Sequence, residues 1–303
     1  MATSESGATA TAGAGPDRGS DALDGTGAVE PGGPPGRDGP RLGPGRGAGT
    51  GSAPRRPASA RAQRPVGRAG ERVHDEPAFV LHTLPWRETS LIVELLTRDH
   101  GRIGCVAKGA KRNGSKLRGV LHAFQPLHVG FSGRHELRTL TSAEWLGGMA
   151  APQGDGLLCA FYLNELIVRL LPRDDAHPQL FDGYAQALVA LGLGESIEGT
   201  LRRFEWMLLR EIGYALDLAL DADERPIDAG RRYALLPGRG FVVADPAEEG
   251  GFSGTTLRDI AAERYESART LAEAKRLTRA LLARHLDGHV LKTRQILLDL
   301  HKL

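Results

Sequence analysis

Three short apolar runs decide the fold of the first ordered part of this chain: AFVLHTL (Ala78–Leu84), SLIVELLT (Ser90–Thr97) and RIGCVA (Arg102–Ala107). Their length and their content of β-branched residues are typical of β-strands, and the charged segment before Gly101 is typical of a turn. The series continues in two further runs, Val120–Phe131 and His135–Trp145. Pro126 must lie at an edge or a bulge, because proline cannot donate a ladder hydrogen bond. Five short strands within about 70 residues predict a small closed or half-closed barrel.

Beyond Met149 the apolar spacing changes from every second residue to every third or fourth, which predicts helices. In TLRRFEWMLLREIG (Thr200–Gly213), the large apolar residues form one helical face. Residues 214–252 contain Gly, Asp and Pro throughout and are expected to be irregular. Ser253 and Thr270 are predicted to cap two later helices. The predicted helices are Gly156–Leu171, Pro178–Leu191, Thr200–Gly213, Ser253–Tyr265, Thr270–Leu286 and Val290–Leu300.

Residues 1–70 contain 17 Gly and 9 Pro and almost no large apolar side chains. Such a segment cannot bury enough apolar surface to offset the entropy of ordering it, so a disordered tail is predicted. Its nine Arg could bind phosphates diffusely, or the tail could have no specific role. The expected organisation is α+β: a disordered tail over 1–72, a barrel domain over 73–150, and an all-helical domain over 151–303 with an irregular insert at about 214–252.

The chain carries a net charge of +2, from 39 Lys and Arg against 37 Asp and Glu, but its charges are segregated. Residues 1–70 and 71–150 each carry +3, and residues 151–303 carry −4. The presence of only two Cys excludes a disulfide-rich scaffold and a four-cysteine zinc site, and it fits a reducing compartment. No apolar run approaches the roughly 20 residues of a membrane span, and the start of the chain lacks secretory-signal features.

The segment KGAKRNGSKLR (Lys108–Arg118) contains five basic residues, two glycines and no acid, and it lies between two predicted strands. An exposed basic loop beside a sheet suits a phosphodiester backbone, because it neutralises phosphates without reading bases. Over residues 86–142 there are ten basic and four acidic residues, a net +6. Trp86 is the candidate for stacking on a base. The alternative is an ordinary solvated loop. The predicted DNA-binding residues are Lys108, Lys111, Arg112, Lys116 and Arg118, supported by Arg87, Arg102, Arg134 and Arg138.

The same segment comes close to a phosphate-binding nucleotide loop, in which Gly-x4-Gly is followed by Lys and then Ser or Thr. Gly109 and Gly114 have the spacing, but Ser115 and Lys116 follow in the reverse order. A strand is predicted to follow, whereas a nucleotide loop must open a helix. A nucleotide site is therefore not expected.

Metal and catalytic patterns are equally sparse. His285 and His289 are four residues apart, yet Gly288 interrupts that helix and no third ligand is near in sequence. Cys105 and Cys159 lie among apolar neighbours and are expected to be packing residues rather than nucleophiles. We expect no enzyme activity, no metal and no cofactor.

The run from Pro77 to Trp145 resembles the N-terminal domain of the RecO family of bacterial recombinational-repair mediators. The resemblance rests on AFVLH (Ala78–His82), PWRETSLIVELLTRDHGRIGCVAKGAKR (Pro85–Arg112), SKLRGVLHAFQPL (Ser115–Leu127) and GRHELRTLTSAE (Gly133–Glu144). Weaker matches follow in FYLNELIVRLL (Phe161–Leu171), RFEWMLLREIGY (Arg203–Tyr214) and LKTRQILLDL (Leu291–Leu300). The resemblance covers about 225 residues and leaves out the tail.

The resemblance implies an OB-fold followed by a helical domain. It implies a protein that binds single- and double-stranded DNA without sequence specificity and anneals complementary strands. With RecR, and in many bacteria RecF, such a protein helps to load RecA onto DNA coated by single-strand-binding protein. Binding to the acidic, hydrophobic C-terminal tail of that protein is also implied. The expected location is the cytoplasm, in association with the nucleoid and without a membrane.

One departure from the family concerns zinc. Many members carry a four-cysteine zinc module in the segment that matches residues 216–245, where this chain has no cysteine. LDLALDADE (Leu216–Glu224) and GRGFVV (Gly238–Val243) stand there instead. A zinc site is therefore not expected, and the segment is predicted to be held by a small hairpin that packs Tyr233, Leu235, Phe241 and Val242.

Two alternatives stay open. In one, the apolar helix faces form a groove for an amphipathic peptide, and the chain is a protein adaptor that contacts DNA only incidentally. In the other, the chain is a nuclease or a nucleotide-dependent enzyme, which the lack of a ligand cluster argues against.

Overall fold

The computed structural model describes residues 72–245, 250–286, 290–293 and 295–296. The predicted disordered tail lies outside the described residues, except for Arg72. Part of the predicted helix over Val290–Leu300 lies outside them too, and of its described residues 292–293 and 295–296 are helical. No helix among the described residues has both the length and the apolar character needed to cross a membrane.

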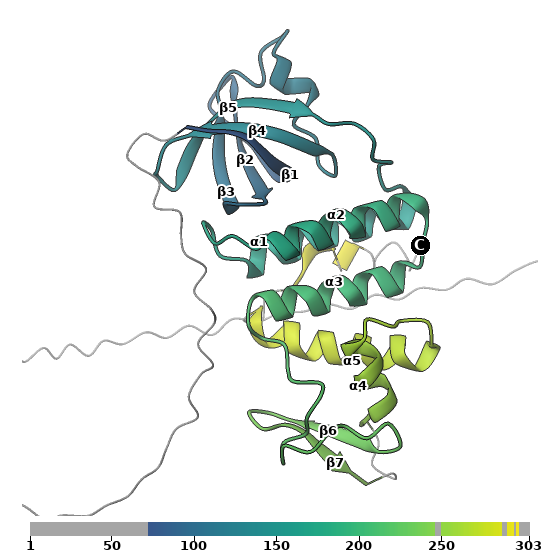
Figure 1. Ribbon diagram of the computed structural model, residues 1–303. Helices are drawn as coiled ribbons and strands as arrows, with labels where there is room; N and C mark the ends of the chain where they lie inside the picture. The colour runs from purple at the N-terminus through teal and green to yellow at the C-terminus, as the bar shows by residue number, and fades with distance from the viewer. Residues whose placement is uncertain (1–71, 246–249, 287–289, 294, 297–303) are drawn as a thin grey trace, which may run out of the picture. The chain divides into compact units, whose positions relative to one another are not determined.

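The N-terminal part is a five-stranded closed barrel (Figure 1). Its order is β1-β2-β3-β5-β4, and β4 pairs back onto β1. The pairs are antiparallel except for β3 with β5, which run parallel. The predicted fold class, an OB-fold barrel followed by helices, is confirmed. The strands are β1 (Arg72–Trp86), β2 (Ser90–Thr97), β3 (Gly101–Ala107), β4 (Pro126–Ser132) and β5 (Leu137–Trp145).

Two predicted strands differ most from the structure in their bounds. The first strand begins at Arg72, and bulges between Val73 and Glu76 and between Val80 and His82 let it pair with β4 at one end and β2 at the other. Of the expected strand over Val120–Phe131, only the second half is extended, as part of β4. The chain before Pro126 is irregular, because Phe124 has a left-handed backbone (φ 66) that ends any extended run. A 3₁₀ helix, η1 (Lys116–Gly119), precedes it.

Strand β1 belongs to two cores because its side chains alternate. Ala78 and Val80 face the barrel interior, which is filled mainly by β-branched, Leu and Phe side chains. Phe79 and Leu81 face the other way and join the core of the helical part. The Phe79 ring lies 5.2 Å from that of Phe181 and 5.1 Å from that of Tyr184, centroid to centroid. The barrel is therefore packed against the helices through an apolar contact.

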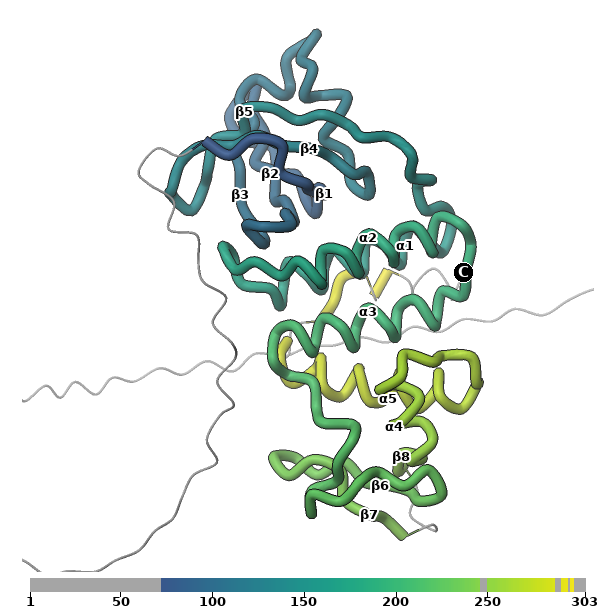
Figure 2. Tube along the Cα trace, viewed as in Figure 1, coloured from purple at the N-terminus to yellow at the C-terminus, as the bar shows by residue number. Residues whose placement is uncertain are grey.

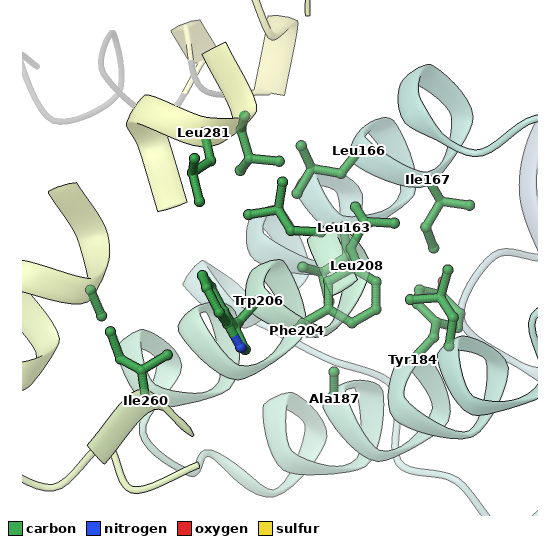
Figure 3. Packing of buried hydrophobic residues seen from close by; sticks show 14 of the residues in the cluster. Leu163, Leu166, Ile167, Tyr184, Ala187, Phe204, Trp206, Leu208, Ile260 and Leu281 are labelled. Atoms are coloured by element: carbon green, nitrogen blue, oxygen red, sulfur yellow. The ribbon is translucent and has the colours of Figure 1, made fainter. Parts of the chain in front are cut away.

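The rest of the chain is mainly helical. Helices α1, α2, α3 and α5 share one large core, part of which Figure 3 shows around Leu163, Phe204 and Leu208. Helix α3 starts three residues before its predicted start, because the Ser196 hydroxyl accepts the N–H of Gly199 (3.3 Å). The helices are α1 (Gly154–Leu170), α2 (Pro178–Leu193), α3 (Ile197–Glu211), α4 (Gly254–Ala261) and α5 (Ala268–His285).

The ends of α4 and α5 differ from prediction. Helix α4 begins after Ser253 as predicted but stops at Ala261, because Glu263 takes a left-handed conformation (φ 55). The predicted cap of α5 at Thr270 is wrong. The cap residue is Ser267, whose hydroxyl accepts the Thr270 N–H (3.1 Å). Thr270 sits inside the helix and is buried.

The segment expected to be irregular contains a three-stranded sheet, so the second part of the chain is not wholly helical. Its order is β7-β6-β8, with β6 (Arg232–Leu236), β7 (Gly240–Ala244) and β8 (Phe252–Ser253), and Figure 2 shows β8 beside β6. The expected hairpin is β6–β7, with Leu235 paired to Phe241. Tyr233 and Phe241 are buried, and the Tyr233 hydroxyl accepts the Asp228 N–H (2.8 Å). Apolar packing thus holds this sheet.

Candidate nucleic-acid interface

The β1–β2 turn and the long connection between β3 and β4 lie together at one end of the barrel. Leu91 pairs with Ala107, so the turn over residues 86–90 stands beside the start of the connection. The Lys111 N–H donates to the Thr89 carbonyl oxygen (2.8 Å), which joins the two segments directly. We call residues 86–90 and 108–119 the basic end of the barrel. Figure 1 shows the connection projecting from the barrel.

Small and apolar residues fix the connection on the barrel. Ala110 and Leu121 are buried in the barrel core, and Leu117 packs against it. Gly109 and Gly114 have φ angles of +68° and +83°, which residues other than glycine rarely adopt. The connection therefore has a defined conformation, is attached to the barrel through its apolar residues, and exposes its polar residues to solvent.

The five cations of this connection are exposed. Within the described part of the chain none of them forms an ion pair. Arg118 makes one hydrogen bond, from Nη1 to the Asn113 side-chain oxygen (3.1 Å). Arg87, in the neighbouring turn, is exposed as well. The cations with charge available for a ligand are Arg87, Lys108, Lys111, Arg112, Lys116 and Arg118.

Two of the predicted supporting residues are already engaged. Arg102 pairs with Glu94 (2.6 Å) and donates through Nε to the Leu171 carbonyl (2.8 Å), and its burial lowers its pKa. Arg138 pairs with Asp174, and its guanidinium lies 5.1 Å from the centre of the Phe131 ring. Both side chains connect the barrel to the segment after α1. This arrangement argues against a role for them in binding phosphates.

The third supporting residue lies elsewhere. Arg134 is exposed in the β4–β5 turn. Strand β5 runs parallel to β3 and starts opposite Gly104, so the turn before it points toward the Gly101 end of β3. The basic end is at the opposite end of that strand, after Ala107. The sequence therefore grouped nine cations, and the structure brings six of them together.

The stacking candidate Trp86 does lie at the basic end. It is the last residue of β1, and 40% of its surface is exposed. The guanidinium carbon of Arg87 lies 5.9 Å from the centre of its ring. A base stacked on Trp86 would therefore also meet a cation.

Neither cysteine has the environment of a nucleophile. Burial raises the pKa of Cys105 to about 12 and also raises the pKa of Cys159. Among the described residues no three His, Cys, Asp or Glu side chains are grouped so as to hold a metal ion. His285 stacks on Tyr214 (3.6 Å between ring centres), and His289 lies outside the described residues.

A second candidate site, which the sequence reasoning missed, is a cavity of about 550 Å³ between α1, α3 and α5. Its walls are mostly apolar, but Arg202 and Glu205 line it from α3. Arg202 is 6% exposed, and its Nη2 donates to Glu205 (2.7 Å). Its Nε and Nη1 atoms have no hydrogen-bond partner among the described residues. A buried guanidinium with unused donors can take an anionic ligand.

Glu205 is the reason that a cation can be buried here. It also accepts the hydroxyl hydrogens of Tyr162 (2.7 Å) and Thr278. Burial, followed by the nearby Glu205 charge, holds the pKa of Tyr162 well above its usual value, so its hydroxyl stays a donor. The signal in the sequence was that Arg202 and Glu205 lie among the large apolar residues of the amphipathic helix α3, at positions that its packing buries and where solvated charges are rare.

Comparison with known proteins gives one family along almost all the described residues. Residues 72–149 match the family model described as recombination protein O N terminal, and residues 152–295 match recombination protein O C terminal. The DNA repair protein RecO of Burkholderia orbicola is 50% identical over 247 residues, which are 80% of this chain and 89% of that protein. The DNA repair protein RecO of Aromatoleum aromaticum is 49% identical over 236 residues, 77% of this chain and 98% of that protein. The resemblance seen in the motifs is confirmed: the chain belongs to the recombination protein O family.

Proposed function

We propose that this protein acts in DNA repair and recombination by binding DNA without sequence specificity through the basic end of its barrel. The observation that carries the proposal is the set of six exposed cations there that form no ion pair within the described part of the chain. Relatives about half identical to this chain carry the name DNA repair protein RecO. The function is that of a mediator rather than an enzyme, located in the cytoplasm with the nucleoid.

The arrangement of charge favours phosphates over bases. The connection carries cations and no acid, so both single- and double-stranded DNA are suitable ligands. A basic surface also screens the repulsion between two complementary strands while their base edges remain free. Annealing follows from this, as does a contribution to loading a recombinase on DNA coated by single-strand-binding protein.

We further propose that the cavity between α1, α3 and α5 binds the acidic, hydrophobic C-terminal tail of single-strand-binding protein. Its apolar walls suit the hydrophobic residues of such a tail. The unused donors of Arg202 suit a carboxylate, and Lys275 and Arg279 line the same cavity. The further partners that we propose for the protein are RecR and, through it, RecF and RecA. In the adaptor alternative, this cavity binds the peptide while the basic end makes only incidental contact with DNA.

The DNA site is tested by fluorescence anisotropy with labelled single-stranded DNA and the full chain. The variant Lys111→Glu/Arg112→Glu/Lys116→Glu reverses three of the six cations. We expect its affinity at about 0.1 M salt to fall more than 100-fold, and to fall for every sequence tested. An affinity within twofold of the unmodified protein would overturn the proposal and leave the adaptor function.

A matched control changes the same charge elsewhere. Arg258, Arg269 and Arg284 are exposed on α4 and α5, and within the described residues they form no ion pair. Their reversal to Glu alters the net charge by the same amount. We expect it to weaken DNA binding by less than fivefold. Equal losses for the two variants would show that overall charge, rather than the basic end, determines binding.

The peptide site is tested by anisotropy of a labelled peptide with the acidic, hydrophobic tail sequence. Arg202→Met removes the buried donors, and we expect at least a tenfold loss of peptide affinity. Arg202→Lys, which keeps the charge but not the fork of donors, should lie between. The DNA affinity of both variants should stay within twofold of the unmodified protein. Unchanged peptide binding by Arg202→Met would refute the assignment.

A further inference from the structure

Strand β5 extends beyond its neighbour on one side. Residues Leu137–Thr139 pair with Gly104–Val106 of β3. Strand β3 ends at Ala107, where the basic connection begins. Because the two strands run parallel, Leu140 lies level with Ala107, and residues 141–145 of β5 continue past the end of β3 toward the basic end. On that side they have no strand partner among the described residues, while their other side stays paired to β4.

Trp145 is the last residue of this overhang. It pairs with Leu127, so the two side chains lie on the same face of the sheet, and Leu127 is fully buried in the barrel core. Trp145 is nevertheless 60% exposed. Trp145 is more exposed than Leu127 because it lies beyond the end of β3, so that no strand flanks it on that side.

The indole of Trp145 is held in one orientation by the connection itself. Its Nε1–H donates to the side-chain oxygen of Gln125 (2.8 Å), and the next residue, Leu146, donates its N–H to the Pro126 carbonyl (3.0 Å). Gln125 lies at the foot of the connection whose arm carries the five cations. The single polar hydrogen of the indole is therefore used, and what remains exposed is an apolar ring.

From this juxtaposition we infer that Trp145 is a base-stacking residue, on which an unpaired base of single-stranded DNA rests while the connection binds its phosphates. This inference rests on the proposed DNA binding and gives it a preference for single strands. Bases in a duplex have both faces occupied by neighbours, whereas an unpaired base has a free face. Glu144, the neighbouring acid, pairs with His128 and lies on the opposite face of β5.

The chemistry of the ligand follows from what surrounds the ring. A protein partner would need a larger apolar surface. The connection whose Gln125 accepts the indole hydrogen of Trp145 instead carries Lys116, Arg118 and three further cations and no acid. An exposed aromatic ring combined with a basic connection binds single strands irrespective of sequence.

The test uses three labelled probes of one length: an oligothymidylate, an abasic phosphodiester strand and a duplex. With the full chain, Trp145→Ala should lower affinity for the oligothymidylate about tenfold. Affinity for the abasic strand should stay within twofold, because that probe has phosphates but no bases. Trp145→Phe, which keeps an aromatic ring, should retain most of the affinity. Leu193→Ala, which removes a 67% exposed apolar residue of α2, is the control and should change nothing.

A second readout is tryptophan fluorescence. The chain has three Trp, and Trp206 is buried. In Trp86→Phe the exposed emitter is therefore Trp145, and we expect it to be quenched by the oligothymidylate but not by the abasic strand. Equal effects of Trp145→Ala on both single-stranded probes, or no effect on either while the unmodified protein binds both, would overturn the stacking role alone. Failure of the unmodified protein to bind either strand would overturn the proposed function itself.

Discussion

The salt dependence of DNA binding gives the sharpest measure of the basic end. Six exposed cations are available there, at Arg87 and along the connection. Each phosphate neutralised on a single strand contributes about −0.7 to the slope of log affinity against log salt, so six give a slope of about −4. Between about 50 and 200 mM salt, affinity should then fall about 300-fold.

Neutralising three of these residues tests the count. In Lys111→Gln/Arg112→Gln/Lys116→Gln three cations remain, the slope should be about −2, and the same change of salt should cost about 20-fold. The assay is anisotropy of a labelled strand at five or so salt concentrations, with fluorescence-detected folding as a check on each variant. Neutral variants isolate the number of contacts, because they add no repulsion.

Arg138→Gln is the matched variant, since Arg138 lies in the same barrel but pairs with Asp174. We expect it to leave the slope unchanged within the error of the fit. If Arg138→Gln lowers the slope as much per charge as the triple variant does, the basic end is not where the phosphates bind. If the triple variant keeps the slope of the unmodified protein, the exposed cations are not phosphate contacts.

Three further predictions concern stability and reactivity. Glu94 is buried and accepts hydrogen bonds from Arg102 and from Arg173 (2.7 Å). Glu94→Gln should therefore lower the free energy of unfolding in urea by about 3 kcal/mol. A loss below about 0.5 kcal/mol would show that these ion pairs do not stabilise the fold. Cys105, whose pKa burial raises to about 12, should resist iodoacetamide at pH 8 in the folded protein and react in urea, as mass spectrometry can show; rapid modification without urea would be the opposite result. Burial alone would raise the pKa of Glu165, but hydrogen bonds from the Thr293 amide and hydroxyl lower it overall, so its stabilising effect is present above a pH of about 4.3 and is lost as pH falls through its folded pKa. Glu165→Gln should therefore cost stability at pH 7 and little near pH 3, whereas an equal cost at both would exclude the linkage.

Local sequence patterns predicted the elements whose signals are local. Strand β2 has its predicted bounds, β3 differs by one residue, and the connection between β3 and β4 was recognised by its glycines and its charge. Boundaries failed where a single backbone conformation ended an element. The left-handed conformations of Phe124 and Glu263 are examples, and nothing in their residue types indicates them.

The roles of the cations could be predicted only in part. The sequence shows that Arg102 and Arg138 are basic and lie in the barrel, but not which acids neutralise them. Arg102 pairs with Glu94 on the neighbouring strand, and Arg138 pairs with Asp174 after α1. Arg173 reaches Glu94 across 79 residues of chain, and Arg138 reaches Asp174 across 36. An exposed cation and a neutralised one look alike in a sequence, because the difference is set by distant contacts.

Periodicity, composition and motifs along the chain are enough to predict the barrel-then-helix order, the basic connection and the family. Folding alone sets which of the nine candidate cations share one end of the barrel, that Trp145 lies beyond the end of β3, and that Arg202 is buried with unused donors. These features depend on strand register, burial and ion pairing, which join residues far apart in the chain. A charge or an aromatic ring acquires a function only from the neighbours that folding gives it.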